Sequence, residues 1–372
     1  MAQYTVVPVR RSRELKNFIN LPWDLYKDDD LWVPPLKSQV KQLLTPGKHP
    51  FWEHAERELF LLMDGDRPVG RIAAIVDRNH NKYHNEKAGK WGFFECVNDP
   101  VGAGMLFAAA QAWLEEKGQE YMHGPFNPST NYEIGMLVEG WQSSPTLMMT
   151  YNPEYYASLV ESSGQAKEKD LYAYLFEEGW HLPGWLSKMA KRVKERNNVT
   201  LRQLDMSRIN QEVQLMNQLY CEAWADNWGF IPASDAEIAI QAKELKQIID
   251  PEFATFLYHK GEPIGVSVVL PDANFLLKKF NGKLGLTSIL KALWYKSKMV
   301  GSRFILLGIK PGYRRLGVPL LAAEQAMRRG YEKGHKYMEV SWTLEDNRMV
   351  NELLNKLGGD LYRRYRIYRK DF

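Results

Sequence analysis

Residues 303–330 read RFILLGIKPGYRRLGVPLLAAEQAMRRG, and this stretch decides how the rest of the chain is interpreted. It begins with an apolar run typical of a β-strand, continues through a turn rich in Gly, Pro and Arg, and ends in a helix-like segment. A helix N-terminus presents unpaired backbone amides and a partial positive charge, so the turn predicts an anion-binding site. The same pattern also fits a tight bend with solvated arginines.

An internal repeat flanks this stretch on both sides. Residues 65–79 (GDRPVGRIAAIVDRN) align with 260–274 (KGEPIGVSVVLPDAN) at an offset of 195 and keep Pro, Gly, Asp and Asn. Residues 115–131 align with 331–347 at an offset of 216 and keep Glu-Lys-Gly, Tyr-Met and the final Asn. Because the offset grows by 21, we expect an insertion of 21 residues between these two blocks of the second copy.

Each copy shows the same order of elements, in which strands joined by a Gly-containing turn are followed by a helix, a strand and another helix. The second copy has strand-like runs ATFLYH, IGVSVVL, RFILLGI, KYMEVSW and LYRRYRIY, with helical LLAAEQAMRRGYEK and NRMVNELLNKL between them. This order predicts two α+β domains. The boundary is predicted in 181–198, where Pro-Gly interrupts the pattern, giving domains 1–180 and 199–372 joined by a basic linker.

Composition predicts an ordinary globular protein. The chain has 372 residues, 45% of them hydrophobic, and 49 basic against 45 acidic residues give a formal charge of +4. Cys96 and Cys221 are far apart and indicate neither a disulfide framework nor a zinc site. The N-terminus lacks a signal-peptide pattern and no run of about 18 apolar residues occurs, so we expect a cytoplasmic protein without a membrane span.

The motif Arg314-x-x-Gly317-x-Pro319, after a strand and before a helix, resembles the Q/R-x-x-G-x-G/A coenzyme A signature of the GNAT acyltransferase superfamily. The later SWTLEDN and LNKLGG also resemble that superfamily's order of elements. The resemblance implies two tandem GNAT-like domains, each a central mixed β-sheet flanked by helices, and acetyl-CoA or a longer acyl-CoA as co-substrate. It also implies contacts to pantetheine and pyrophosphate from Gly308, Ile309, Arg314, Arg315, Leu316, Gly317 and Val318.

Two positions depart from the signature. Pro319 stands where Gly or Ala is usual; it has no amide hydrogen, but Pro is tolerated in the first turn of a helix. Leu354 stands where the superfamily often has a tyrosine that acts as general acid. Other candidates for that role are Tyr362, Tyr365 and Tyr368.

The first copy lacks the cationic turn. Its equivalent segment, 98–105, contains no arginine, and Asp99 would repel a phosphate. The first copy is therefore predicted not to bind coenzyme A and to contribute to the acceptor side.

Acyl transfer to an ammonium group requires a base, an oxyanion donor and an acid for the departing thiolate. Glu339 in KYMEVSW is the candidate base, because strand alternation places it with Tyr337 and Ser341 on the less apolar face. A surface or structurally paired carboxylate is an equally good interpretation. Glu345 and Asn347 are further catalytic candidates; a helix begins there, so capping of that helix by Asp346 or Asn347 is the alternative.

The first copy has a polar run, HGPFNPSTNYEIGMLVEGW, that follows its strand EYMHG. Asn131 and Glu133 in this run are candidates for acceptor binding, with a Pro-rich turn that satisfies its own backbone as the alternative. His80 and His84 are four residues apart, but no carboxylate or Cys completes a metal pattern. We therefore expect structural or acceptor-binding roles for both histidines and no metal ion.

The additional residues of the second copy fall in 275–304, FLLKKFNGKLGLTSILKALWYKSKMVGSRF, with six lysines up to Lys298 and no acid. Leucines at helical spacing beside Trp294 and Tyr295 predict a basic amphipathic helix. Such a helix packs on the protein core or lies on an anionic membrane surface. The basic segment 181–198 has a similar composition.

Most of the chain also resembles the branch of the superfamily that includes bacterial ceramide synthases. The resemblance is found in GFFECVNDP, GPFNPSTNYEIGMLVEGW, MMTYNPEYY, KEKDLYAY, VSWTLEDN and YRIYRK. It implies transfer of a long acyl chain from acyl-CoA to the amine of a sphingoid base, with peripheral contact to the inner face of the membrane.

Two other functions fit the sequence: a soluble small-molecule or peptide N-acetyltransferase, and a non-catalytic acyl-CoA sensor. No nucleic-acid partner is expected, because the aromatic residues near the lysines lie among leucines at helical spacing. The sequence does not indicate an oligomeric state.

Overall fold

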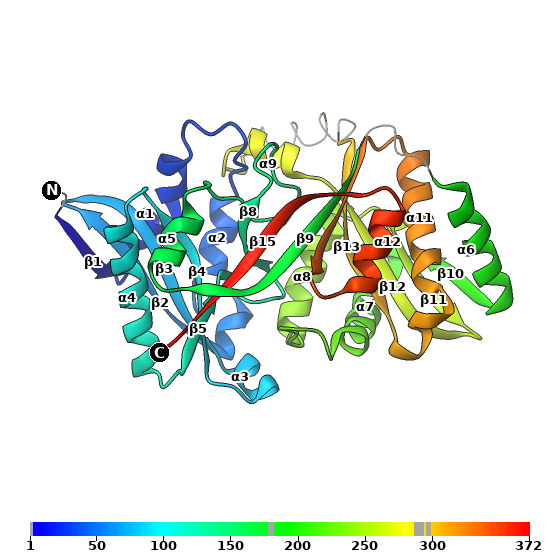
Figure 1. Cartoon of the computed structure of the whole chain (residues 1–372), viewed down its shortest axis with the longest axis horizontal. Coiled ribbons are helices and arrows are strands. Elements are labelled where there is room, and N and C mark those ends of the chain that lie inside the picture. Colours follow the sequence, from blue (N-terminus) through cyan, green and yellow to red (C-terminus); the bar gives the residue numbers. More distant parts are fainter. Residues whose placement is uncertain (1–2, 178–181, 286–293, 295–298) are drawn as a thin grey trace. The chain divides into compact units, whose positions relative to one another are not determined.

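The structure is a computed structural model that describes residues 3–177, 182–285, 294 and 299–372 (Figure 1). Its contacts divide the chain into two units. Unit 1 comprises Met1–Leu171, Leu276–Ala292 and Arg363–Phe372, and unit 2 comprises Tyr172–Phe275 and Leu293–Tyr362. Each unit contains a mixed β-sheet flanked by helices, as the sequence predicts.

Unit 1 is built on strands that are adjacent in the order β1-β2-β3-β4-β5-β15. The β4–β5 pair is parallel and the other pairs are antiparallel. Its elements are β1 (Tyr4–Pro8), α1 (Ser12–Leu25), α2 (Lys37–Leu43), η1 (Pro50–Glu53), β2 (Ala55–Asp64), β3 (Arg67–Asp77), α3 (Arg78–His84), β4 (Ala88–Cys96), α4 (Pro100–Glu116), β5 (Tyr121–Gly124), β6 (Phe126–Asn127), β7 (Glu133–Ile134), β8 (Met136–Glu139), α5 (Tyr156–Ser162), the start of β9 (Ala166–Phe176) and most of β15 (Asp360–Asp371).

Strand β3 lies at the centre of the unit 1 core. Its sequence is apolar without alternation because both faces are covered. Ile72 and Ala74 join the cluster that contains Leu106 and Phe107 of α4, whereas Ala73 joins the cluster formed with α1. Unit 1 therefore has a helix layer on each side of its sheet.

Unit 2 has the sheet order β9-β14-β13-β12-β11-β10, in which the β13–β14 pair is parallel and the β12–β13, β11–β12 and β10–β11 pairs are antiparallel. Its elements are α6 (Gly184–Arg196), β10 (Val199–Gln203), η2 (Met206–Arg208), α7 (Ile209–Trp224), α8 (Asp235–Ile248), η3 (Pro251–Phe253), β11 (Ala254–His259), β12 (Glu262–Pro271), β13 (Gly301–Ile309), η5 (Pro311–Leu316), α11 (Val318–Glu332), β14 (Tyr337–Leu344) and α12 (Arg348–Lys356). Helix α9 (Asn274–Phe280) begins in unit 2 and continues from Leu276 in unit 1. Helix α11 supplies apolar residues to the core, including Leu321, Ala322, Ala326 and Met327.

The strand registers confirm the internal repeat. Gly70 of β3 pairs with Cys96 of β4, and Gly265 of β12 pairs with Ile309 of β13. The offset is thus 195 between β3 and β12 but 213 between β4 and β13. Of the 21 additional residues in the second copy, 18 therefore lie between β12 and β13.

The division into units departs from the boundaries drawn from sequence, because unit 2 begins at Tyr172 and Leu276–Ala292 belongs to unit 1. Residues 181–198, predicted as a linker, include helix α6, which packs against α11. Arg363–Phe372 groups with unit 1 because β15 pairs with β5 and β8. The amphipathic helix predicted around Trp294 falls mainly on residues 286–298, which apart from Trp294 lie outside the described residues.

Candidate active site

The turn that carries the coenzyme A signature connects β13 to α11 in unit 2. Pro311 begins the short helix η5, and Gly317 separates η5 from α11 with a φ of +77°. A Cβ atom at Gly317 would lie 2.8 Å from Val193 Cγ2 of α6. Both the left-handed backbone and the close approach of α6 therefore require glycine at this position.

The first turn of α11 has no side-chain cap, because its N-cap residue is Gly317. Val318 and Leu316 flank that glycine, so the predicted anion-binding residues are contiguous around the helix start. The Arg315 side chain is exposed on the turn. An uncapped helix N-terminus beside an exposed guanidinium is suited to a phosphate group.

Arg314 has a different role in the turn. Its Nε donates to the Ile309 carbonyl at 3.1 Å, and its Nη2 donates to the Ala223 carbonyl at the end of α7. Arg314 therefore ties the turn to β13 and α7, whereas Arg315 is the more accessible cation.

The predicted pantetheine contacts, Gly308 and Ile309, lie where β13 leaves its parallel partner. The recorded register between β13 and β14 ends at Phe304 and Val340. Beyond that point β13 continues to Ile309 beside β12. A strand edge that diverges in this way presents backbone groups to which an extended ligand can bind.

Glu339 lies on β14 immediately before the divergence and is 0% exposed. Its carboxylate accepts hydrogen bonds from the hydroxyls of Ser341 and Tyr362, and its Oε1 is 3.8 Å from Arg303 Nε. Arg303 also donates from Nε to Ser341 Oγ at 2.9 Å. Glu339 is therefore a buried carboxylate that is bonded to two hydroxyls and lies beside a guanidinium.

The three tyrosine candidates lie in different surroundings. Tyr362 is half-buried, and its hydroxyl donates to Glu339. Tyr365 is buried in unit 1. Tyr368, also in unit 1, donates to Glu161 at 3.1 Å, and burial raises the pKa of its hydroxyl well above the ordinary value.

Asn347 caps α12, as the capping alternative predicted. Its Oδ1 accepts from the Val350 amide at 3.4 Å. The backbone carbonyl of Glu345 accepts from Asn351 Nδ2 at 3.4 Å. Asn347 therefore has a structural contact that accounts for its position at the start of the helix.

In unit 1 the equivalent helix start is closed by the chain itself. Asp99 Oδ1 accepts from the amides of Val101 and Gly102 at 2.9 and 3.3 Å, and Asp99 Oδ2 accepts from the Tyr4 hydroxyl. The amides that an anion would use at α4 are thus already bonded to a carboxylate.

The diverging edge of β4 is also occupied from within unit 1. The Phe93 amide donates to Asn127 Oδ1 at 2.7 Å, and the Cys96 amide donates to the Tyr156 hydroxyl at 3.0 Å. Tyr155 donates to the Cys96 carbonyl at 2.8 Å. These contacts occupy backbone groups of the β4 edge from within unit 1, and at the corresponding place in unit 2 the Ile309 carbonyl accepts from Arg314 Nε.

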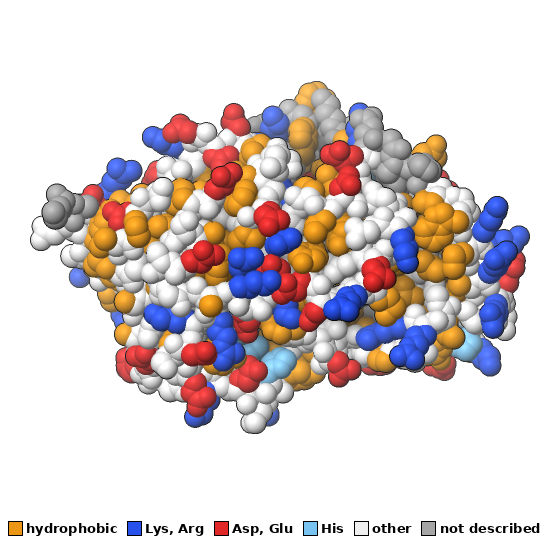
Figure 2. Space-filling view, viewed as in Figure 1, with side chains coloured by type: hydrophobic (Ala, Val, Ile, Leu, Met, Phe, Trp, Pro, Cys, Tyr) orange, Lys and Arg blue, Asp and Glu red, His pale blue; other side chains and the backbone are white. Residues whose placement is uncertain are grey.

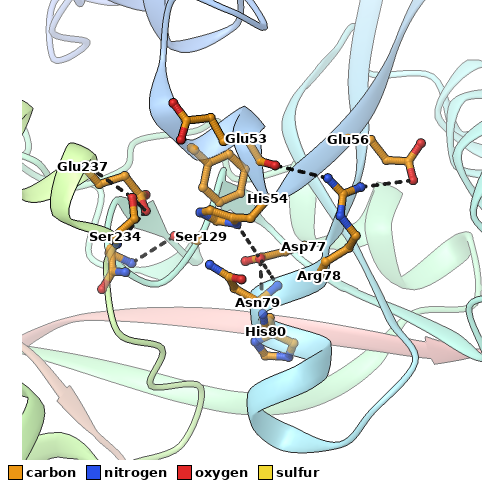
Figure 3. A network of polar contacts seen from close by, with 12 residues as sticks. Glu53, His54, Glu56, Asp77, Arg78, Asn79, His80, Ser129, Ser234 and Glu237 are labelled. Atoms are coloured by element: carbon orange, nitrogen blue, oxygen red, sulfur yellow. Dashed lines mark hydrogen bonds and ion pairs between the residues drawn. The ribbon is translucent and has the colours of Figure 1, made fainter.

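Unit 1 contains a buried polar cluster around the end of β3 (Figure 3). Asp77 caps α3 through the Asn79 and His80 amides and pairs with His54 Nδ1 and with the buried Lys90 Nζ at 3.2 and 2.9 Å. Burial, together with the charge of Lys90, lowers the pKa of His80 to about 3. His80 is therefore a neutral core residue at neutral pH.

The predicted acceptor-binding residues of unit 1 come from helix α3 and from the segment around the small β6–β7 pair. The rings of His80 and His84 are 4.7 Å apart between centroids, whereas Asn131 and Glu133 lie near the small β6–β7 pair. The Asn131 amide donates to Ser129 Oγ at 3.3 Å, and Glu133 is exposed. Across the described part of the chain, no group of His, Cys, Asp or Glu has an arrangement that would hold a metal ion.

Sequence reasoning missed Arg303, the cation opposite Glu339. Arg303 pairs with Glu339 in the β13–β14 register, just as Lys90 pairs with His123 in the β4–β5 register. The repeat contains a signal for Arg303, because the basic Lys90 of the first copy lies 213 residues before it. Without the strand register, however, that offset is hidden by the insertion.

Comparisons with known proteins agree with this architecture. A tandem GNAT protein from the clavulanic acid biosynthesis pathway superimposes with a TM-score of 0.56 at 11% identity, over 99% of this chain and 98% of that chain. The fold is thus that of two tandem GNAT domains, which is the class predicted from the sequence. No family model matches the sequence.

Two curated proteins share a higher sequence identity with this chain than the tandem GNAT structure does, and they define the family. The bacterial ceramide synthase of Caulobacter vibrioides is 38% identical over 99% of this chain and 98% of its own length. Protein YghO of Escherichia coli is 31% identical over 96% of this chain and 93% of its length. The chain belongs to the family of these bacterial ceramide synthase relatives, and it is an N-acyltransferase of the GNAT type.

Proposed function

We propose that this N-acyltransferase uses a long-chain acyl-CoA as donor and a lipid amine such as a sphingoid base as acceptor. The observation that carries the proposal is the difference between the two helix starts. In unit 2, Gly317 leaves the α11 amides uncapped beside exposed Arg315. In unit 1, Asp99 bonds the equivalent amides. This difference favours one acyl-CoA site, in unit 2.

The donor site combines the turn and the strand edge. The α11 amides and Arg315 suit the pyrophosphate, and the edge of β13 from residue 305 to Ile309 suits the pantetheine, whose amides can bond to a strand backbone. Arg314 holds this geometry by bonding Ile309 and Ala223. The acyl carbonyl would then lie near the point where β13 and β14 separate.

Glu339 and Tyr362 form the proton-transfer pair of the proposed reaction. The buried Glu339 has no exposed surface for direct contact with an amine, whereas the hydroxyl of half-buried Tyr362 bonds to its carboxylate. An ammonium proton passes to the Tyr362 oxygen as the phenolic proton passes to Glu339. The amine nitrogen then bonds to the acyl carbon and the carbon–sulfur bond breaks. Of the two protons that the nitrogen loses, one ends on the thiol and one in solvent.

The acceptor class rests on the relatives. The printed name of the Caulobacter vibrioides protein refers to ceramide synthesis, and that protein matches this chain over nearly its whole length. A sphingoid base is an amphiphile that partitions into membranes, so we propose that the enzyme works at the inner membrane face. The structure describes no helix long and apolar enough to cross a membrane.

Thiol release tests the donor and acceptor together. We expect purified protein to release CoA from palmitoyl-CoA when sphinganine is present, and to release little from acetyl-CoA with a water-soluble amine. The opposite preference would overturn the lipid acceptor and favour the soluble N-acetyltransferase. Tight binding of CoA esters without turnover for any amine would favour the acyl-CoA sensor.

A further inference from the structure

Helix α6 has an inner and an outer face. Leu186 and Ala190 are buried and join the clusters that include residues of α11. Trp185 and Met189, one helical turn apart, are instead 40% and 43% exposed. Large apolar side chains at consecutive turns of an exposed helix face are typical of a surface that meets an apolar partner.

The outer face of α6 is strongly cationic. Its exposed basic residues are Lys188, Lys191, Arg192, Lys194 and Arg196. The helix contains one acid, Glu195, which lies 3.9 Å from Lys191, so the helix carries four more basic than acidic side chains. Lysine and arginine side chains are seen along the edge of the space-filling view that α6 occupies, whereas they are mixed with acidic residues over the rest of the face shown (Figures 1 and 2).

This surface continues into the acyl-CoA turn. Asn197, at the end of α6, donates from Nδ2 to the Leu316 carbonyl at 3.0 Å, and Val193 contacts the Gly317 position. Leu316 is 41% exposed, and the neighbouring Arg315 is exposed as well. The same combination of apolar and cationic side chains therefore extends from α6 to the edge of the donor site.

We propose that the outer face of α6, extended by Leu316, docks on an anionic membrane surface. Trp185 and Met189 would enter the interfacial region of the bilayer while the lysines and arginines contact lipid phosphates. The phosphates of coenzyme A would occupy the turn without needing these exposed apolar residues. The inference rests on the proposed function, because a membrane beside the donor turn serves an acceptor that resides in lipid.

Vesicle binding by the full chain tests the docking surface. We expect binding to vesicles of phosphatidylglycerol and phosphatidylcholine, weak binding to phosphatidylcholine alone, and a loss of affinity at high salt. Each cation near an anionic surface contributes about a five-fold increase in binding, so Lys188→Gln with Arg192→Gln should weaken it about 25-fold. Trp185→Ala should weaken the binding that remains at high salt.

A matched control removes the same charge elsewhere. Arg67→Gln with Lys82→Gln, on exposed positions of unit 1, should leave vesicle binding unchanged. Equal binding by the α6 variant and this control would overturn the proposal, as would displacement of vesicles by a DNA duplex at matched charge concentration.

Thiol release with dispersed palmitoyl-CoA and a detergent-solubilised sphinganine separates the docking proposal from the proposed function. Turnover without vesicle binding overturns the docking surface alone, and vesicle binding without turnover overturns the function alone.

Discussion

Glu339 and Arg303 face each other on the parallel strands β14 and β13, with 3.8 Å between Oε1 and Nε. The equivalent positions in unit 1 hold His123 and Lys90, which also pair in register. Both copies thus retain a basic residue opposite a titratable group at the same place in the sheet. In unit 2 this place adjoins the diverging strand edge, which makes Glu339 the centre of the proposed chemistry.

Replacing Glu339 with Gln should lower kcat by about 100-fold or more, the usual contribution of a positioned proton-transfer group, with little change in the KM for acyl-CoA. The exposed Glu352 of α12 provides a matched control, and Glu352→Gln should leave both constants unchanged. Steady-state kinetics with saturating acceptor measure the effect. Retention of kcat in Glu339→Gln would leave this carboxylate a purely structural role.

Tyr362→Phe tests whether the pair acts as a unit. Alone it should lower kcat, because the ring remains but the hydroxyl that contacts Glu339 is lost. Combined with Glu339→Gln it should add almost nothing, since groups that act together are not additive. Fully additive losses in the double variant would show that the two residues act separately.

Arg315→Gln should raise the dissociation constant for CoA by about 10-fold or more, because a charge-assisted hydrogen bond contributes about 1.5–3 kcal/mol. The fold should be unaffected, because Arg315 is exposed. Arg314→Gln should instead lower the free energy of unfolding, since two buried carbonyl contacts are lost. Equilibrium CoA binding and denaturant unfolding, measured on both variants, distinguish these roles. Reversed results would assign the phosphate contact to Arg314.

Unit 1 should lose stability as the pH falls below about 6.5, the ordinary pKa of histidine. The folded pKa of His80 is lowered to about 3, so the unfolded chain binds more protons than the folded chain throughout that interval. Stability is therefore complete above pH 6.5 and declines towards pH 3. His80→Gln should flatten the decline between pH 6.5 and 5, where Asp77 is still ionised in both states. Thermal unfolding across this window provides the measurement, and an unchanged slope would contradict the assignment.

Local patterns predicted the elements well. ATFLYH became β11 with the expected bounds, and the coenzyme A turn lies between a strand and a helix as the motif required. Periodicity and turn chemistry are local, so these features can be deduced from neighbouring residues. The repeat also predicted the tandem GNAT architecture, because each copy contains the same order of strands and helices.

Long-range features could not be deduced in the same way. Strand alternation placed Glu339 on a face of β14 but did not show that Tyr362 and Arg303 would cover it. The last strand groups with unit 1 because it pairs with β5, and β5 lies more than 200 residues earlier in the chain. Pairing at such separation depends on the assembled sheet and leaves no signal in the local sequence.

The central claim is that the chain has one acyl-CoA site, located in unit 2, and calorimetric titration with CoA tests it most directly. We expect one CoA per chain in the wild type and in Asp99→Ala, because Asn127, Tyr155 and Tyr156 still fill the edge of β4. Arg315→Glu should abolish binding. Two CoA molecules per chain, or full binding by Arg315→Glu, would contradict the account.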